Sequence, residues 1–278
     1  MGPDEPHPVE VLNPASQCPV LLVCEHAGDR VPLQLAAGYS RDVMGTHYGA
    51  DLGAGAVTRL LAERLGATAV LARYSRIVID PNRRLDDPTL VLAEADGAPV
   101  SANQNLSASA LKARITDLYL PLHLQIAAEL SRLASRAVPI YVAIHSFTPM
   151  LAGSARPWDA GIMWDTDARV ADRVIASLAA ASDFQVGLNE PYTGKAPQDF
   201  SVDFHAERNG LPNVAIEMRQ DHLATQSGIE RWAVLLETAL RPLLGADWAA
   251  LPAPACLAAR APDQKQFEAD LADWMRTT

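Results

Sequence analysis

The chain has 278 residues, of which 49% are hydrophobic, and its 23 Lys+Arg against 33 Asp+Glu give a net charge of −10. This charge argues against a nucleic-acid-binding protein, because phosphate neutralisation needs a basic face. No apolar run approaches the roughly 18 residues of a membrane span, and residues 1–17 lack the basic and then apolar pattern of a signal peptide. We therefore expect a soluble, cytoplasmic protein with no membrane or nucleic-acid partner.

The cationic residues are unevenly chosen. Three of the 23 are lysines, so the other twenty are arginines. Arginine is suited to bidentate hydrogen bonding with carboxylates. A GC-rich genome, however, raises the Ala and Arg contents together without any functional reason. The total count favours the genomic explanation, so the positions of individual arginines matter more than their number.

Strand and helix patterns alternate through the first part of the chain. An apolar run predicts a buried strand at 19–24, and apolar residues at helical spacing predict a helix at 47–65. Two further strands are predicted at 67–72 and 77–79. A long irregular stretch follows at 88–106, and loops of this length in compact domains are often functional.

The same alternation continues to the end of the chain. The predicted elements are a helix at 107–136 bent at Pro121, strands at 139–144 and 161–164, a helix at 165–181, a strand at 184–188, a polar loop at 189–201, a strand at 214–217, a helix at 227–244 and a short helix near 264–275. This order predicts a three-layer α/β fold with a mixed, mostly parallel sheet and helices on both faces. We expect one catalytic domain over 1–278, with peripheral tails at 1–18 and about 250–278.

Polar residues stand where four of the predicted strands end. His26 and His145 follow the first and the central strand, Asn82 and Arg83 follow the strand at 77–79, and Glu217 ends the last strand. Ligands of such sheets bind beyond the carboxyl ends of the strands. A single histidine there is usually structural, but two imidazoles and a carboxylate also form a zinc site with an open position. The pattern makes a metal-dependent hydrolase a candidate.

The residues alone leave the third metal ligand open. Asp29 lies three residues after His26, a spacing that can chelate one ion, and Asp51 lies four residues after His47 on the predicted helix. Each could equally be a surface carboxylate. His205 fits either a position lining the site or a structural position, and Glu25 is expected to point away from His26 in a supporting role.

Several short motifs occur together in a recognisable order. They are Cys24-Glu25-His26-Ala27-Gly28, Tyr74-Ser75-Arg76, Asp80-Pro81-Asn82-Arg83, Ile144-His145-Ser146, Glu190-Pro191-Tyr192-Thr193-Gly194 and Leu211-Pro212-x-Val214-x-Ile216-Glu217-x-Arg219. In this order the sequence resembles the N-formylglutamate amidohydrolase family from about residue 20 to 223. That family is similar to zinc carboxypeptidases and aspartoacylase, so the resemblance implies a metal hydrolase on a mixed α/β sheet.

The resemblance also implies roles for individual residues. His26 and His145 match the family's zinc-binding histidines, and Glu217 matches its general base. Asn82 and Arg83 match the pair that grips the substrate's carboxylate in related hydrolases.

Three further assignments complete the expected site. Arg76 would polarise the scissile carbonyl and stabilise the oxyanion, and Arg219 would add to a locally cationic pocket. The family's recurrent acid aligns better with Asp51, so Asp51 is favoured as the third zinc ligand and Asp29 is its rival.

The expected reaction is zinc-dependent hydrolysis of a small, anionic N-acyl amino acid, with N-formyl-L-glutamate as the leading candidate. That substrate would place the protein in histidine degradation, although the sequence looks closer to another branch of the family than to the enzyme of that pathway. Two alternatives stay open. One is a related metallohydrolase acting on another acyl amino acid or a peptide fragment, and the other is a non-catalytic anion-binding protein.

Overall fold

A computed structural model of the chain describes residues 1–2, 4–196, 198–245 and 264–277. Its centre is a seven-stranded sheet of order β1-β3-β2-β6-β11-β9-β10. The strands are β1 (Val9–Leu12), β2 (Val20–Cys24), β3 (Thr68–Ala72), β6 (Ile140–Phe147), β9 (Ala160–Met163), β10 (Val186–Leu188) and β11 (Asn213–Arg219). Two small hairpins, β4 (Glu94–Ala95) with β5 (Ala98–Pro99) and β7 (Met150–Leu151) with β8 (Ser154–Ala155), lie outside this sheet.

The sheet is mixed and mostly parallel. Strands β3, β2, β6 and β11 run parallel to one another, whereas β1 is antiparallel to β3 and β9 is antiparallel to β11. The last strand, β10, is parallel to β9. The four central strands therefore place their carboxyl ends at the same edge, as the fold class expected from the sequence requires.

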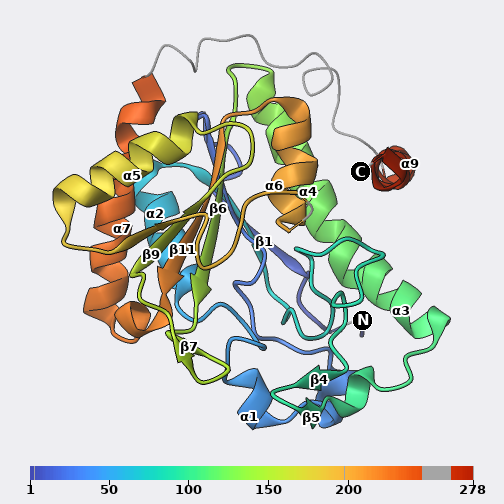
Figure 1. Ribbon diagram of the computed structural model, residues 1–278. Coiled ribbons are helices and arrows are strands. Elements are labelled where there is room, and N and C mark those ends of the chain that lie inside the picture. Colours follow the sequence, from blue (N-terminus) through green and yellow to red (C-terminus); the bar gives the residue numbers. More distant parts are fainter. Residues whose placement is uncertain (3, 197, 246–263, 278) are drawn as a thin grey trace.

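Helices cover both faces of the sheet, which makes three layers (Figure 1). On one face lie α2 (Ala54–Leu65), α5 (Arg169–Ala181) and α7 (Gln226–Leu240), and on the other lie α4 (Leu120–Ala134) and α6 (Phe200–His205). The remaining helices are α1 (Arg41–Met44), α3 (Ala108–Arg114) and α9 (Gln264–Thr277), with short turns of other helix types at Leu33–Gly38, Ser101–Asn103, Ile115–Tyr119, Glu207–Asn209, Gln220–Leu223 and Arg241–Gly245. Among the described residues, no helix is both long and apolar enough to cross a bilayer.

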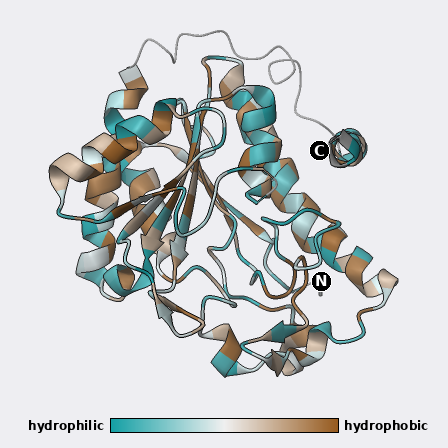
Figure 2. Cartoon of the chain, in the orientation of Figure 1, coloured by the Kyte–Doolittle hydropathy of each residue, from teal (hydrophilic) through white to brown (hydrophobic). Residues whose placement is uncertain are grey.

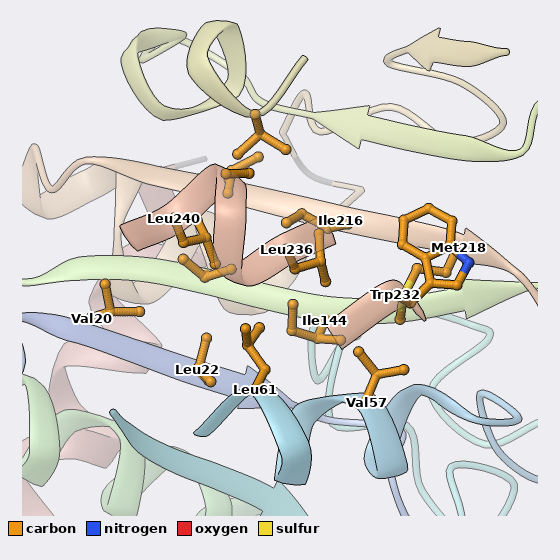
Figure 3. Close-up of a cluster of buried hydrophobic side chains, with 14 of the residues drawn as sticks. Val20, Leu22, Val57, Leu61, Ile144, Ile216, Met218, Trp232, Leu236 and Leu240 are labelled. Atoms are coloured by element: carbon orange, nitrogen blue, oxygen red, sulfur yellow. The ribbon is translucent and has the colours of Figure 1, made fainter. Parts of the chain in front are cut away.

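The strands are apolar throughout because both of their faces are buried. Alternate residues of a strand point to opposite faces, so Leu22 packs with α2 and α7 while Leu21 and Val23 pack with α4. Figure 3 shows the first of these layers, where Leu61 and Leu236 meet the side chains of the central strands. The hydropathy colours follow the same division, with brown strands at the centre and teal on much of the helix surface (Figure 2).

Some expected boundaries were wrong. Residues 77–79 are not a strand. Residues 76–78 form a turn, in which the Val78 amide donates to the Ser75 carbonyl (3.0 Å), and the apolar side chains of 77–79 fill a separate cluster beside the sheet. The helix expected at 107–136 is α3 and α4 joined through a π-helical turn at Ile115–Tyr119, just before Pro121, which cannot donate a backbone hydrogen bond.

The structure describes the first expected tail and part of the second. Residues 1–18 include β1, which pairs with β3 as an edge strand of the sheet. Residues 246–263 lie outside the described part of the chain. The helix expected near 264–275 is present as α9, and its Phe267 and Leu271 are buried against the cluster beside the sheet.

Candidate metal centre and active site

The polar strand ends predicted from the sequence converge at one edge of the sheet. Strands β6 and β11 place His145 directly beside Glu217 in their parallel register. Strand β2 lies on the other side of β6, and it ends at Cys24, just before His26. Parallel strands therefore bring together side chains that are far apart in the sequence.

His26, Asp51 and His145 form a buried cluster with the geometry of a metal site. Each offers a nitrogen or carboxylate oxygen, and these donor atoms all lie within 4.8 Å of one another. Asp51 Oδ2 lies 2.9 Å from His145 Nδ1 and 3.4 Å from His26 Nδ1. Two imidazole nitrogens and one carboxylate are a donor set that suits a divalent cation with an open coordination position.

Asp51 reaches this position from a loop. The helix expected at 47–65 begins only at Ala54, because Gly53 has a left-handed backbone (φ +82°) and a Cβ there would lie 2.5 Å from the Leu223 side chain. The Asp51 amide donates to the His26 carbonyl (3.0 Å), and Asp51 Oδ2 also accepts from the Ser146 amide (3.3 Å). The loop thus holds the carboxylate against both histidines.

Asp29 is not part of the cluster. After His26 the chain runs along Arg73, and a Cβ at Gly28 would lie 2.2 Å from the Arg73 carbonyl oxygen. This close approach carries Asp29 to an exposed position on the surface. Of the two acids considered from the sequence, only Asp51 lies beside both histidines.

Buried charges surround the cluster. Asp80 Oδ1 lies 2.7 Å from His26 Nε2, and Arg76 bridges Asp80 (Nη2–Oδ2, 2.6 Å) and Asp51 (Nη1–Oδ1, 3.2 Å). Burial raises the pKa of Asp51, but the nearby charge of His26 and the hydrogen bonds from both histidines outweigh it, so that pKa falls. Burial is likewise outweighed at Asp80, where the charges of Arg76 and His26 hold the pKa well below its usual range. Both carboxylates are therefore ionised at neutral pH.

The same electrostatics favour positive charge on the donor atoms. Burial lowers the pKa of His145, but its hydrogen bond to Asp51 and the charge of Glu25 outweigh burial and raise that pKa to about 10. A divalent cation on the three donors would supply this charge in place of protons. The residues present thus fit a metal ion.

Glu217 lies beside the cluster, and one of its carboxylate oxygens makes no hydrogen bond to a described residue. Its side chain is 6% exposed, and Oε2 has no hydrogen-bond partner among the described residues. Burial and the negative charge of Asp51 raise the pKa of Glu217. A buried carboxylate of raised pKa is what a general acid–base residue needs.

These groups open into a cavity of about 520 Å³, within the size range of small-molecule sites. Its charged lining consists of Arg76, Arg83, Asp80, Asp199 and Glu217, together with the polar residues His26, His47, Tyr48, Asn82, Thr89, His145, Tyr192, Thr193 and Gln198. The prediction that the pocket is locally cationic is therefore wrong, because the lining contains both arginines and carboxylates.

Arg83 is the cation of the cavity that remains available. It donates to the Asn82 carbonyl (3.0 Å) and to Thr89 Oγ1 (3.2 Å), and it forms no ion pair with a described carboxylate. The side chain of Asn82, next to Arg83, is held against the start of α6, because Asn82 Oδ1 accepts from the Ser201 amide (2.8 Å).

Two residues expected in the site are not brought into it. Arg219 pairs with Asp159 (3.0 Å) and Asp221 (2.8 Å) and does not line the cavity. His205 is buried, and its Nε2 lies 2.9 Å from Nδ1 of His123. Burial lowers the pKa of both histidines, so this is a neutral pair inside the protein.

Three further carboxylates lie near the site; no role was predicted for Asp80 and Asp199, and only a supporting one for Glu25. Asp80 contacts His26, Glu25 contacts His145 (3.4 Å), and Asp199 lines the cavity. For Glu25 the signal was available, because a residue that points away from His26 lies on the face of β2 that Leu21 and Val23 share.

Comparison with known proteins identifies the family. A family model described as N-formylglutamate amidohydrolase matches residues 18–224. The chain belongs to the N-formylglutamate amidohydrolase family. It is therefore a hydrolase of that family with a buried His-Asp-His candidate metal site.

Two solved structures share the fold of this chain. The chain is 34% identical to a gene product of Agrobacterium tumefaciens, with a TM-score of 0.79, covering 86% of this chain and 96% of that one. It shares the fold of an N-formylglutamate amidohydrolase from Ralstonia eutropha at 18% identity, with a TM-score of 0.69, covering 85% of this chain and 97% of that one. A search of curated proteins found no match.

Proposed function

We propose that this chain hydrolyses the amide bond of a small, anionic N-acyl amino acid with the help of a divalent metal, for which zinc is the leading candidate. The observation that carries the proposal is the buried donor set of His26, Asp51 and His145, beside a Glu217 oxygen that has no hydrogen-bond partner among the described residues. N-Formyl-L-glutamate is the leading substrate, supported by the family to which the chain belongs.

Glu217 serves as the general base in this proposal. His26, Asp51 and His145 would hold the ion, which when bound polarises the scissile carbonyl and makes water more acidic. Glu217 takes the proton of the attacking water and returns it to the leaving amine as the C–N bond breaks. The raised pKa of Glu217 suits both proton transfers.

Arg76 and Arg83 would bind different parts of the substrate, its scissile carbonyl and its carboxylate. Arg76 uses three of its five N–H donors on Asp80 and Asp51, so its remaining donors can reach the substrate's carbonyl oxygen from the cavity wall. Arg83, which has no carboxylate partner among the described residues, would pair with a substrate carboxylate, and Asn82 beside it would supply an amide.

The test is formate release from N-formyl-L-glutamate by purified enzyme with and without zinc. We expect activity that a chelator abolishes and zinc restores, and that Glu217→Gln removes while Arg219→Ala retains it. Formate release that survives both the chelator and Glu217→Gln would overturn the mechanism.

A substrate panel and a metal measurement test the rest of the proposal. Comparison of N-formylglutamate with N-formylglutamine, N-acetylglutamate and short γ-glutamyl peptides identifies the acyl group and side chain that fit the cavity. One bound zinc per chain, lost in His26→Ala and His145→Ala, supports the enzyme. Tight dicarboxylate binding without any metal would instead support a non-catalytic binding protein.

A further inference from the structure

Glu25 is a buried carboxylate for which the proposed reaction has no use. Its side chain is fully buried, at the end of β2, and Oε1 accepts a hydrogen bond from the Tyr141 hydroxyl (3.2 Å). The other oxygen, Oε2, lies 3.4 Å from Nε2 of His145. Neither of these two atoms has a hydrogen-bond partner within the described part of the chain.

The sheet register brings Glu25 to His145. Strands β2 and β6 are parallel, with Val23 opposite Ala143. Two residues further along the chain come Glu25, directly after β2, and His145 within β6, on the same face because side chains alternate. Strand β11 continues the row with Glu217, which is opposite His145. Three polar residues thus form one row across the carboxyl ends of three neighbouring strands.

The contact is made by the ring nitrogen of His145 that faces away from the candidate metal. Its Nδ1 faces Asp51 Oδ2 (2.9 Å), so Nε2 is the nitrogen left for Glu25. A carboxylate on the far nitrogen of a metal-binding histidine fixes the tautomer and the ring orientation, and makes the ligating nitrogen more basic. Asp80 stands in the same relation to His26, at 2.7 Å.

The surroundings argue against a purely structural role for Glu25. A carboxylate with no exposed surface is costly unless it is paired, and an apolar residue would continue the run of Leu21 and Val23 without that cost. Asp80 is neutralised by Arg76, whereas Glu25 has no arginine or lysine among its ion pairs in the described residues. The positive groups available to pair with Glu25 are His145 and a metal ion bound on the other side of the His145 ring.

We propose that Glu25 is the positioning residue of His145. It holds Nε2–H of the imidazole, aims Nδ1 at the ion and raises its affinity for metal. This inference rests on the proposed metal-dependent function. A hydrogen-bond chain extends the support further, because the Tyr141 hydroxyl also contacts Ser201 Oγ (2.7 Å), and the Ser201 amide donates to Asn82 (2.8 Å). These contacts connect Glu25, through Tyr141 and Ser201, to Asn82 in the lining of the cavity that would bind the substrate.

The test measures zinc affinity by competition with a chromogenic chelator, for the full chain and two variants. Glu25→Gln removes the charge but keeps an acceptor, and we expect about 10-fold weaker zinc binding. Glu25→Ala removes both, and we expect a loss nearer 100-fold, the upper part of the range for such outer partners. Glu129→Gln is the matched control, because Glu129 is a buried glutamate on α4 that pairs with Arg132, and we expect unchanged zinc affinity.

A second readout separates positioning from general destabilisation. With saturating Co²⁺ in place of zinc, we expect the visible absorption bands to shift in Glu25→Gln and to stay unchanged in Glu129→Gln. If Glu25→Ala does not fold, Glu25→Gln decides the question. Equal zinc affinity and equal Co²⁺ spectra in wild type and Glu25→Gln would overturn the inference while leaving the proposed function intact. Failure of the wild type to bind either metal would overturn both.

Discussion

Replacement of Glu217 by glutamine is expected to remove activity and to increase stability at the same time. The carboxylate is 6% exposed and one of its oxygens has no partner among the described residues. An unsatisfied buried group costs about 1–3 kcal/mol, and 1 kcal/mol moves the melting temperature by about 2–4 °C in a chain of this size. We therefore expect Glu217→Gln to melt about 2–12 °C higher than the wild type, in metal-free protein at pH 8.5.

The pH dependence follows from the direction of the pKa shift. Burial raises the pKa of Glu217 in the folded protein, so the wild type loses stability as pH rises above the pKa of an unfolded glutamate, about 4.3. The advantage of Glu217→Gln should accordingly be small at pH 5 and larger at pH 8.5. The same variant, loaded with zinc, should lose about 10²- to 10⁴-fold in kcat, the contribution typical of a general base.

The assays are calorimetric or fluorescence melting curves and formate release. Glu63→Gln is a matched control, because Glu63 is exposed on α2, and it should change neither the melting temperature by more than about 1–2 °C nor kcat. A lower melting temperature for Glu217→Gln than for the wild type would refute the reasoning about burial. An unchanged kcat would refute the assigned role.

Three further predictions concern residues of the site and its surroundings. Asp51→Asn should weaken zinc binding by about 100-fold or more while Asp29→Asn leaves it unchanged, as measured by calorimetric titration; the reverse result would restore Asp29 as the ligand. Arg83→Ala should raise KM for N-formylglutamate by about 10- to 100-fold, the value of a charge-assisted hydrogen bond, whereas Arg219→Ala should leave KM and kcat unaltered, and equal effects of the two would contradict the placement of Arg83. Burial and nearby carboxylates raise the pKa of Asp203 to about 8, and neither of its oxygens has a hydrogen-bond partner in the described part of the chain. Asp203→Asn should therefore raise the melting temperature by an amount that grows between pH 4 and pH 8, since the wild type loses stability over that window; a constant difference across it would count against the shift.

Strand positions were the most predictable part of the fold. The apolar runs at 19–24, 67–72 and 139–144 are strands β2, β3 and β6, because strands buried on both faces are apolar throughout. The run at 77–79 has the same composition but is not a strand, since burial beside the sheet gives the same pattern as burial within it. An apolar run in the sequence predicts that a segment is buried, but not which other segment it packs against.

Site residues divide in a similar way. His26, His145 and Glu217 could be proposed from the sequence because each follows an apolar run, and parallel strands bring such ends together. Arg219 satisfied the same criterion, but its side chain turns to Asp159 and Asp221. The position of a residue along a strand does not determine the rotamer or the partners of a long side chain.

By itself, the sequence determined the layered α/β class, the edge of the sheet that carries the site and the family resemblance, because these depend on periodicity, strand ends and short motifs. Only the tertiary structure shows that Asp51, and not Asp29, lies beside the two histidines, since a left-handed glycine and a loop, rather than a helix, position Asp51 there. It also decided that Glu25 faces His145, that Arg76 is held between two carboxylates, and that Arg83 remains available. Contacts between distant segments follow from packing and strand register, which no local stretch of sequence encodes.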